Sequence, residues 1–288
     1  MQTLANHMWT SDLMDATYTF YALSSRVEGI DKFRQQLSAA LQGLPPAPFE
    51  ASDAPAVPDA PDVAMVRSAF QGTLEPVLAL MPEGLRERYI AINERTLAAG
   101  VEEVKAEAQG RVLDVESYLR LRPVAVYGYW MGAHTEFTLG IDLTEDLSTH
   151  PELASLVDNV ALSLALVNDL FSFRKEYYEG EMLSCVWVFH VKEGLSLQGA
   201  VDKTCDLINQ NESEFIAKRD RILAGELGKR GDIRAYLAGL GYSMSGNLHY
   251  HRSCPRYHGL DHDWSTQIVS GLVTLDRDRT TVDPAARR

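Results

Sequence analysis

Apolar residues recur every three to four positions along most of the chain, which is the spacing of amphipathic α-helices. Alternating runs of β-branched residues, which are typical of strands, are nearly absent. The pattern therefore predicts an all-α fold. The expected helices cover residues 5–28, 31–42, 62–80, 83–109, 115–139, 151–178, 195–223, 231–251 and 262–274.

One stretch of the chain departs from this pattern. Residues 44–61 hold six of the twelve prolines, and proline lacks the amide hydrogen that a helix interior needs. The 43 residues before it are too few to form a core alone, so we expect a long surface loop within one domain covering residues 1–275. Residues 276–288 are charged and lack apolar periodicity, which predicts a flexible C-terminal tail.

The composition excludes several classes of protein. With 45% hydrophobic and 23% charged residues, the 288-residue chain is globular, and its richest apolar segment, residues 153–171, is interrupted by polar residues, which argues against a membrane span. Three cysteines are too few for a disulfide framework, and the first residues lack the pattern of a signal peptide, so we expect a cytoplasmic protein. The net charge of -13 disfavours nucleic-acid partners. A homodimer is left open.

The most informative motif is the segment NDLFSFRKE, residues 168–176. Its residues Asn168, Ser172 and Glu176 are spaced i, i+4, i+8, so on a helix they lie along one face, about 6 Å apart per step. The preceding run, residues 160–167, is apolar nearly all round, which predicts that this polar row lies in a buried helix. Amide, hydroxyl and carboxylate oxygens are the ligands that Mg²⁺ prefers.

The segment resembles the second metal-binding motif of class I terpene synthases, N/D-D-(L/I/V)-x-S-x-x-x-E, at every defined position. The likeness is to fungal and bacterial sesquiterpene synthases. It implies the helical bundle of class I terpenoid synthases, an isoprenyl diphosphate substrate, and Mg²⁺, or Mn²⁺ as an alternative, bound by Asn168, Ser172 and Glu176. Lys175 matches a diphosphate-binding lysine of the fungal-type members.

Two further segments match the diphosphate-binding residues of this family. Arg256 and Tyr257, 88 residues after Asn168, resemble its C-terminal Arg-Tyr pair, and they follow a Gly-Asn pattern in which Tyr250 replaces the usual tryptophan. Arg122, 46 residues before Asn168, resembles the diphosphate-sensing arginine. The match around Arg122 is partial. Proline stands at position 123 in place of a second arginine, and the expected helix-breaking glycine is residue 128.

The first, aspartate-rich metal motif of the family is degenerate in this chain. By spacing it falls on residues 20–29, where Ser24 and Ser25 replace both aspartates and Glu28 is the remnant ligand. Asp12 and Asp15 offer an alternative acidic pair about 18 Å earlier along the same helix. About 20 residues precede Ser24, fewer than is usual in the family, which leaves two alternatives for the N-terminal cap of the active site: the start is truncated, or another segment covers the pocket.

Terpene cyclisation also needs aromatic faces that stabilise carbocations. Aromatic residues near the motifs are candidates for lining the pocket, with plain core packing as the alternative for each: Phe20, Tyr21, Tyr127, Trp130 and Tyr250. The histidines at 249, 251, 258 and 262 lack metal-ligand order and are expected to be surface or pocket polar groups, with a proton-transfer role as the alternative. The signatures of zinc hydrolases, dithiol oxidoreductases, P-loop proteins and α/β-hydrolases are missing.

The resemblance thus implies a terpene cyclase that ionises a linear isoprenyl diphosphate, with farnesyl diphosphate favoured, and cyclises the cation to a sesquiterpene. The metal ligands would be Asn168, Ser172 and Glu176, and the diphosphate would contact Arg122, Lys175, Arg256 and Tyr257. The serines at 24 and 25 keep two alternatives open. One is a homologue without turnover that binds an isoprenoid diphosphate or a partner protein. The other is an enzyme that uses fewer metal ions on an unusual prenylated substrate.

Overall fold

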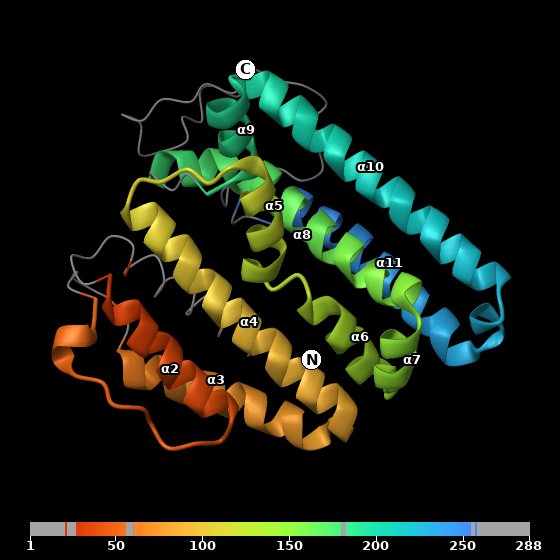
Figure 1. Ribbon diagram of the computed structural model, residues 1–288, viewed down its shortest axis with the longest axis horizontal. Helices are drawn as coiled ribbons and strands as arrows, with labels where there is room; N and C mark the ends of the chain where they lie inside the picture. Colours follow the sequence, from red (N-terminus) through yellow and green to blue (C-terminus); the bar gives the residue numbers. More distant parts are fainter. Residues whose placement is uncertain are drawn as a thin grey trace.

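The computed structural model describes residues 21, 27–55, 60, 62–179, 183–254 and 257. Every regular element in this part of the chain is helical, which confirms the predicted all-α class (Figure 1). The α-helices are α2 (Gly29–Leu41), α3 (Val63–Leu80), α4 (Glu83–Ala108), α5 (Val115–Ala125), α6 (Trp130–Leu139), α7 (Thr144–Thr149), α8 (Pro151–Glu179), α9 (Cys185–Glu193), α10 (Leu197–Ala224) and α11 (Gly231–Ser253), with short 3₁₀ helices η1 (Ala51–Asp53) and η2 (Leu227–Lys229).

The predicted helices agree with these bounds to within two residues, with three exceptions. The helix predicted over residues 115–139 is two helices, α5 and α6, and the short helices α7 and α9 were not predicted. The helices predicted at 5–28 and 262–274 lie almost wholly outside the described residues, as does the tail at 276–288. In the described part of the proline-rich segment, residues 44–55, the only regular element is η1, as expected for a loop.

Side-chain caps fix where several helices begin. Asp62, Asp114, Ser184 and Ser196 each accept a hydrogen bond from a backbone amide three residues ahead, at the first turns of α3, α5, α9 and α10. Such a cap satisfies an amide that has no partner within the helix. Helix α9 thus has its own start signal, and Gly194 ends it in the left-handed conformation that glycine favours.

The break between α5 and α6 explains the wrong prediction for residues 115–139. Proline 123 is tolerated in the last turns of α5, which ends at Ala125. Tyr127 then adopts a positive φ of 60°, and the chain passes close to α8 at Gly128. A Cβ atom at Gly128 would lie 2.7 Å from the Cα of Ala161, so only glycine allows this approach.

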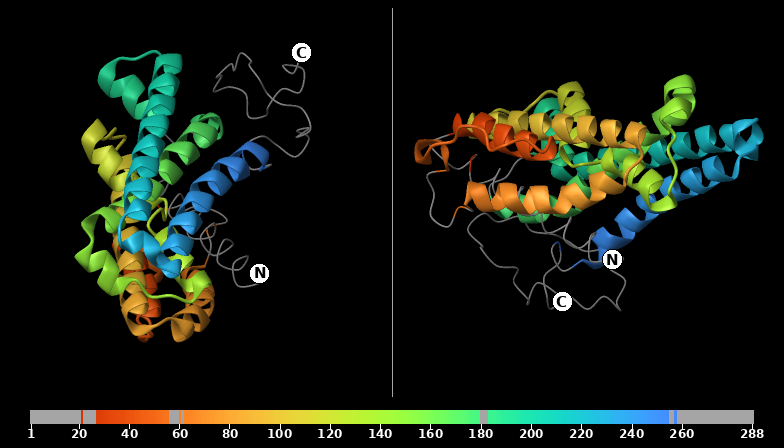
Figure 2. Two further views of the ribbon diagram at one scale, coloured as in Figure 1. Left: turned by 90° about the vertical axis from the view of Figure 1, so that its right-hand side faces the viewer. Right: turned by 90° about the horizontal axis from the view of Figure 1, so that it is seen from below.

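The buried side chains form three clusters, and α8 contributes to two of them. The first cluster joins α2, α3 and α4, and includes Phe33, Phe70 and Tyr89. The second joins α8 to α10 and α11, and the third joins the C-terminal half of α8 to α5, α9 and α10. Helix α8 therefore runs through the middle of the bundle, with α10 on one side and α5 and α6 on the other (Figure 1). Helices α10 and α11 meet at η2 and diverge from there (Figure 2).

The central position of α8 accounts for its composition. By length and composition alone, the segment 151–177 could cross a membrane, since its most apolar part has a mean hydropathy of 1.4. Of that part, 56% is buried within the protein, and the neighbouring helices α5, α6, α7, α9, α10 and α11 contact α8. A core helix that is covered on most sides has the same composition as a membrane span.

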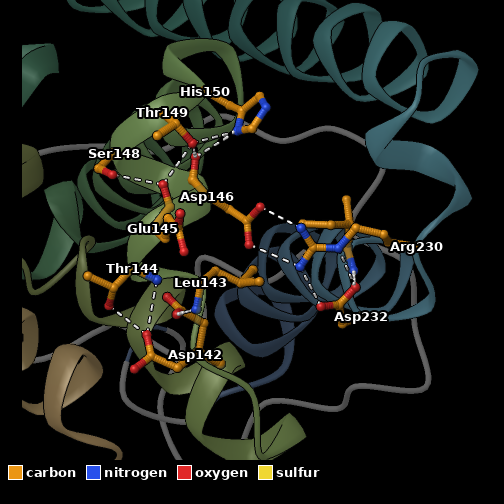
Figure 3. Close-up of polar contacts among 12 residues, drawn as sticks. Asp142, Leu143, Thr144, Glu145, Asp146, Ser148, Thr149, His150, Arg230 and Asp232 are labelled. Carbon is orange, nitrogen blue, oxygen red and sulfur yellow. Dashed lines mark hydrogen bonds and ion pairs between the residues drawn. The ribbon is translucent and has the colours of Figure 1, made fainter.

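Polar side chains tie the short helix α7 to the ends of its neighbours (Figure 3). Arg230, directly before α11, donates to Asp146 of α7 at 3.0 Å and to Asp232 at 2.7 Å. Buried Glu136 of α6 accepts from Arg88 of α4 at 2.6 Å and from the amide of Leu143 at 2.8 Å. These contacts hold the α6–α7 connection against α4 and α11, at the end of α8 that lies farthest from the motif.

We predict that Gly128→Ala destabilises the protein by about 1–3 kcal/mol, because the added methyl group must displace the backbone of α8. The matched control is Gly72→Ala in α3, where a Cβ meets nothing within 4 Å. This control should stabilise the helix by about 0.5–1 kcal/mol, since alanine loses less backbone entropy. Urea unfolding followed by circular dichroism measures both changes, and equal effects of the two variants would contradict the close approach.

Candidate functional site

The C-terminal half of α8 carries the predicted motif. Asn168, Ser172 and Glu176 all lie within this helix, as the sequence predicts, so their spacing places them along one face. Ser172 is buried, and Glu176 is half-buried. The motif thus lies inside the bundle, where it interrupts an otherwise apolar helix.

Asp169, the second residue of the motif, lies at the centre of a buried network. Its carboxylate accepts hydrogen bonds from Arg122 Nε at 2.8 Å, from the Tyr118 hydroxyl at 2.7 Å and from the backbone amide of Cys185 at 2.9 Å. The side chain is fully buried, and its charge is met by one cation and two neutral donors. Asp169 therefore fixes α5 and the start of α9 against α8, rather than pointing along the Asn168–Glu176 row.

Arg122, in α5, contacts two other helices, α4 and α8, through its guanidinium. Besides Asp169, it donates from Nη1 to Glu103 of α4 at 3.2 Å and from Nη2 to Asn168 Oδ1 at 3.1 Å. Burial acts to lower the pKa of Arg122, but Asp169 and Glu103 outweigh it and hold this pKa well above its usual range. Burial raises the pKa of Glu103, an effect that Arg122 partly offsets.

Asn168 uses its whole carboxamide in this network. Its oxygen accepts from Arg122, while its Nδ2 group contacts His251 Nε2 and the Tyr257 hydroxyl, each at 3.2 Å. An arginine only donates hydrogen bonds, so the atom of Asn168 that faces it must be the oxygen. Arg122, Asn168 and Tyr257, predicted from three separate motifs, are thereby joined in one hydrogen-bonded chain.

Ser172 and Glu176 continue the row beyond Asn168. The Ser172 hydroxyl oxygen is buried, with no hydrogen-bond partner among the described residues. A buried hydroxyl in this state costs free energy unless something binds it. Glu176 lies close enough for its charge to act on Arg122. One amide, one hydroxyl and one carboxylate oxygen suit a hard divalent cation that keeps several of its other ligands as water or phosphate.

Within the described ranges, no three His, Cys, Asp or Glu side chains are grouped so as to hold a metal by themselves. The Asn168–Glu176 row supplies only one carboxylate, so it offers part of a coordination shell. The remaining ligands of an ion at this row would have to come from a bound anion, from water or from the segment around Ser24, which lies outside the described residues.

The other predicted diphosphate ligands are only partly placed. Lys175 lies in α8 and is half-buried. Tyr257 stacks on the ring of His251 with centroids 4.7 Å apart, and Tyr250 packs edge-on against both rings. Glu28 is exposed, directly before α2. Arg256, Phe20, the serines at 24 and 25, and the acidic pair at 12 and 15 lie outside the described residues.

The remaining aromatic candidates lie in packed surroundings. Tyr21 is fully buried, packs against Phe33 of α2 and donates from its hydroxyl to the carbonyl of Asp53 at 2.9 Å. Tyr127 and Trp130 contact each other at the α5–α6 break, with tilted rings whose centroids lie 4.3 Å apart. Trp130 also packs on Tyr89 of α4. Tyr21 is thus a core residue of the first cluster, whereas Tyr127 and Trp130 flank the break that follows Arg122.

Comparison with known proteins identifies the family of the chain. A model of the family described as "Terpene synthase family 2, C-terminal metal binding" matches residues 10–214, a range that includes Arg122 and the whole Asn168–Glu176 row. The chain belongs to the terpene synthase family. Its curated relatives include a (3S,6E)-nerolidol synthase of Selaginella moellendorffii, 31% identical over 76% of this chain and 61% of that protein. Another is the sesquiterpene synthase Agr1 of Cyclocybe aegerita, 27% identical over 64% of this chain and 53% of that protein.

Solved terpene synthases share the fold. The 2-methylisoborneol synthase of Streptomyces coelicolor A3(2) superposes with a TM-score of 0.71 at 19% identity, over 91% of this chain and 78% of that one. A linalool/nerolidol synthase of Streptomyces clavuligerus superposes with a TM-score of 0.63 at 22% identity, over 78% of this chain and 73% of that one. The predicted class I terpenoid synthase fold is confirmed. The chain spans less than two thirds of the length of the curated terpene synthases named above.

Sequence reasoning missed four residues of the Arg122 network. Tyr118 was visible as the tyrosine four residues before Arg122, one helical turn away. Asp169 is part of the motif, but the motif alone does not predict its contacts with α5 and α9. The sequence predicts only a surface or pocket polar group at His251. Glu103 carries no sequence signal, because its contact with Arg122 depends on how α4 packs against α5.

We predict that Arg122→Met lowers the free energy of unfolding by about 3–5 kcal/mol, because it leaves Asp169 and Glu103 buried without their cation. The matched control is Arg120→Met, two residues away, where an exposed arginine pairs with exposed Glu116. This control should change stability by less than about 1 kcal/mol. Chemical denaturation compares the two, and a loss no larger at 122 than at 120 would show that the guanidinium does not hold the carboxylates.

The Cys185 thiol gives a second test of this packing. Burial, with the charge of Asp169 added, holds the pKa of Cys185 well above its usual range, so its thiolate is scarce at pH 8. We expect iodoacetamide at pH 8 to modify Cys254 and Cys205 in the native protein and Cys185 only after unfolding. Burial also raises the pKa of Cys205, so its rate should keep rising as the pH passes 8.5. Peptide mass spectrometry locates each modified thiol, and early labelling of Cys185 would count against the α8–α9 contact.

Proposed function

We propose that this protein is a class I terpene synthase that binds a linear isoprenyl diphosphate at the C-terminal half of α8 and converts it to a sesquiterpene. The observation that carries the proposal is the meeting of Arg122, Asn168 and Tyr257 in one hydrogen-bonded chain, next to a buried Ser172 hydroxyl that lacks a described partner. These residues come from motifs up to 135 residues apart and match the family's diphosphate and metal positions.

The protein's own side chains would bind and orient the diphosphate. Arg122 already extends its Nη2 group toward the Asn168–Glu176 row, where it would donate to a phosphate oxygen in a charge-assisted hydrogen bond. Tyr257 holds its hydroxyl beside Asn168. Lys175, which precedes Glu176, and Arg256, which precedes Tyr257, would add two cations. Together these donors would stabilise the charge that develops as the carbon–oxygen bond breaks.

Asn168, Ser172 and Glu176 would hold Mg²⁺, or Mn²⁺, which when bound withdraws electron density from the diphosphate leaving group. The Asn168 oxygen accepts one hydrogen bond and has a second lone pair for such an ion. The Ser172 hydroxyl has an unused lone pair in the same row. Tyr127 and Trp130 would present aromatic faces to the carbocation near the α5–α6 break.

The names of the relatives favour a farnesyl, C15, substrate. Two of the most similar curated proteins are a nerolidol synthase and a sesquiterpene synthase. One of the solved structures with this fold holds Mg²⁺ and a fluorinated neryl diphosphate, a C10 compound, which supports the metal and the diphosphate but not the chain length. We propose farnesyl diphosphate with cyclisation, and product analysis separates a cyclic hydrocarbon from an open-chain alcohol.

A second candidate function follows from one sequence observation. Ser24 and Ser25 stand where the family carries its first pair of metal-binding aspartates. A chain that lacks this pair could retain the diphosphate site and bind an isoprenoid diphosphate without ionising it. The experiment below distinguishes this binder from the enzyme.

The purified protein is incubated with geranyl, farnesyl and geranylgeranyl diphosphate and Mg²⁺, and the products are separated by gas chromatography with mass spectrometry. We expect a product from farnesyl diphosphate that disappears when EDTA removes the metal. Glu176→Gln should lower kcat/KM by more than the roughly 10–100-fold that loss of an outer-shell partner of a metal costs. Ser172→Ala, which removes the hydroxyl, should also lower kcat/KM.

The matched control is Glu152→Gln at the exposed start of the same helix, which should keep full activity. If no substrate gives a product, the double change Ser24→Asp with Ser25→Asp is tested next. Product from this variant would support a site that needs the missing pair. If neither protein gives a product, and a thermal shift requires both Mg²⁺ and pyrophosphate, the protein binds the diphosphate without turnover and the enzyme proposal is wrong.

A further inference from the structure

His251 is a buried residue of α11 that the proposed mechanism does not use. Its side chain is only 4% exposed, and its ring lies between Tyr257 on one side and Phe171 of α8 on another, with centroids 4.7 and 6.0 Å away. Both ring nitrogens have polar neighbours. Nδ1 lies 2.8 Å from the backbone carbonyl of Asn247, and Nε2 lies 3.2 Å from Asn168 Nδ2.

These two contacts determine which nitrogen of His251 carries the proton. The Asn247 carbonyl only accepts hydrogen bonds, so Nδ1 must donate to it. In the neutral ring, Nε2 then has a lone pair and no proton, and it accepts from the Asn168 amide. The ring is thereby held in one tautomer by its own helix and presents an acceptor to α8.

An acceptor at this position fixes the Asn168 carboxamide. If the amide were rotated by 180°, its oxygen would face the Nε2 lone pair and its Nδ2 group would face the Arg122 guanidinium, so two contacts would become repulsive. The Tyr257 hydroxyl takes part in the same arrangement, because it receives the second N–H of Asn168 while its ring stacks on His251. Acceptors at one end of the amide and a donor at the other leave one stable orientation.

We propose that His251 is a positioning residue that holds the Asn168 oxygen toward Arg122, in the orientation in which this oxygen would bind a divalent cation beside a diphosphate. A partner of this kind behind a metal-ligating group sets its orientation and strengthens its binding. The metal part of this inference rests on the proposed function. The orientation itself rests on the contacts of His251 alone.

The first measurement uses the metal-free protein and needs no activity. In protein labelled with ¹⁵N-histidine, two-bond proton–nitrogen correlation spectra distinguish the two neutral tautomers, and the His251→Leu spectrum assigns the signal. We expect His251 to carry its proton on Nδ1. A proton on Nε2 would overturn the proposal, because the ring would then face Asn168 as a donor.

The second measurement is the affinity for inorganic pyrophosphate in the presence of Mg²⁺, obtained by calorimetry. His251→Leu removes the acceptor and should weaken this affinity by roughly 10–100-fold. His251→Gln supplies an amide oxygen in its place and should restore most of the affinity. His249→Leu, an exposed histidine on the same helix, is the matched control and should bind as the unchanged protein does.

An unchanged affinity in His251→Leu would contradict the positioning role, as would an equal loss in His251→Leu and His251→Gln. If the unchanged protein does not bind Mg²⁺ and pyrophosphate at all, the proposed function fails. The tautomer of His251 in the metal-free protein then still decides for or against its role in orienting Asn168.

Discussion

The Arg122 guanidinium, buried between Asp169, Glu103 and Asn168, is the interaction on which the rest of the site depends. Through it α4, α5 and α8 meet at one point, and Asp169 extends the contact to Tyr118 and to the first amide of α9. A buried charge pair adds little net stability over apolar packing, but removing one partner is costly. The network therefore specifies how these helices are placed relative to one another more than it drives their folding.

A steric constraint at the α5–α6 break allows this network to form. The missing side chain at Gly128 lets the chain lie against Ala161 of α8, and Asn168 follows about 10 Å further along the same helix. Any larger residue at 128 would push the end of α5 away from α8, and the guanidinium of Arg122 would move with it. Close packing at an apolar contact thus sets the geometry of a polar one two helical turns away.

The sequence predicted most of this fold, because apolar residues recur with the helical period along each long helix. The resemblance to the family's motifs predicted that Arg122, Asn168 and Tyr257 lie in one site, because each residue matches a motif whose place in the chain agrees with the family. The apolar periodicity did not predict the α5–α6 break, because it continues through residues 126–129. The family resemblance did place a helix-breaking glycine at residue 128, where the approach to Ala161 requires one. The sequence could not predict the contact of Glu103 with Arg122 or that of His251 with Asn168, since each depends on which helices are neighbours. The short helices α7 and α9 span too few turns to show a period.

The charges of the site explain why a terpene synthase of this composition would need a divalent cation to bind its substrate. Among the described residues of the network, one guanidinium faces the carboxyl groups of Asp169, Glu103 and Glu176. When they are ionised, these three carboxylates carry more negative charge than the positive charge of Arg122. A diphosphate that approaches the row would therefore meet a net negative field. Burial raises the pKa of Glu103, which reduces the excess without reversing it. A divalent ion on the Asn168–Glu176 row would neutralise this excess of negative charge. Binding of the metal and the diphosphate is therefore expected to be strongly cooperative. One carboxylate leaves the coordination shell of the ion incomplete, and diphosphate oxygens would supply further ligands.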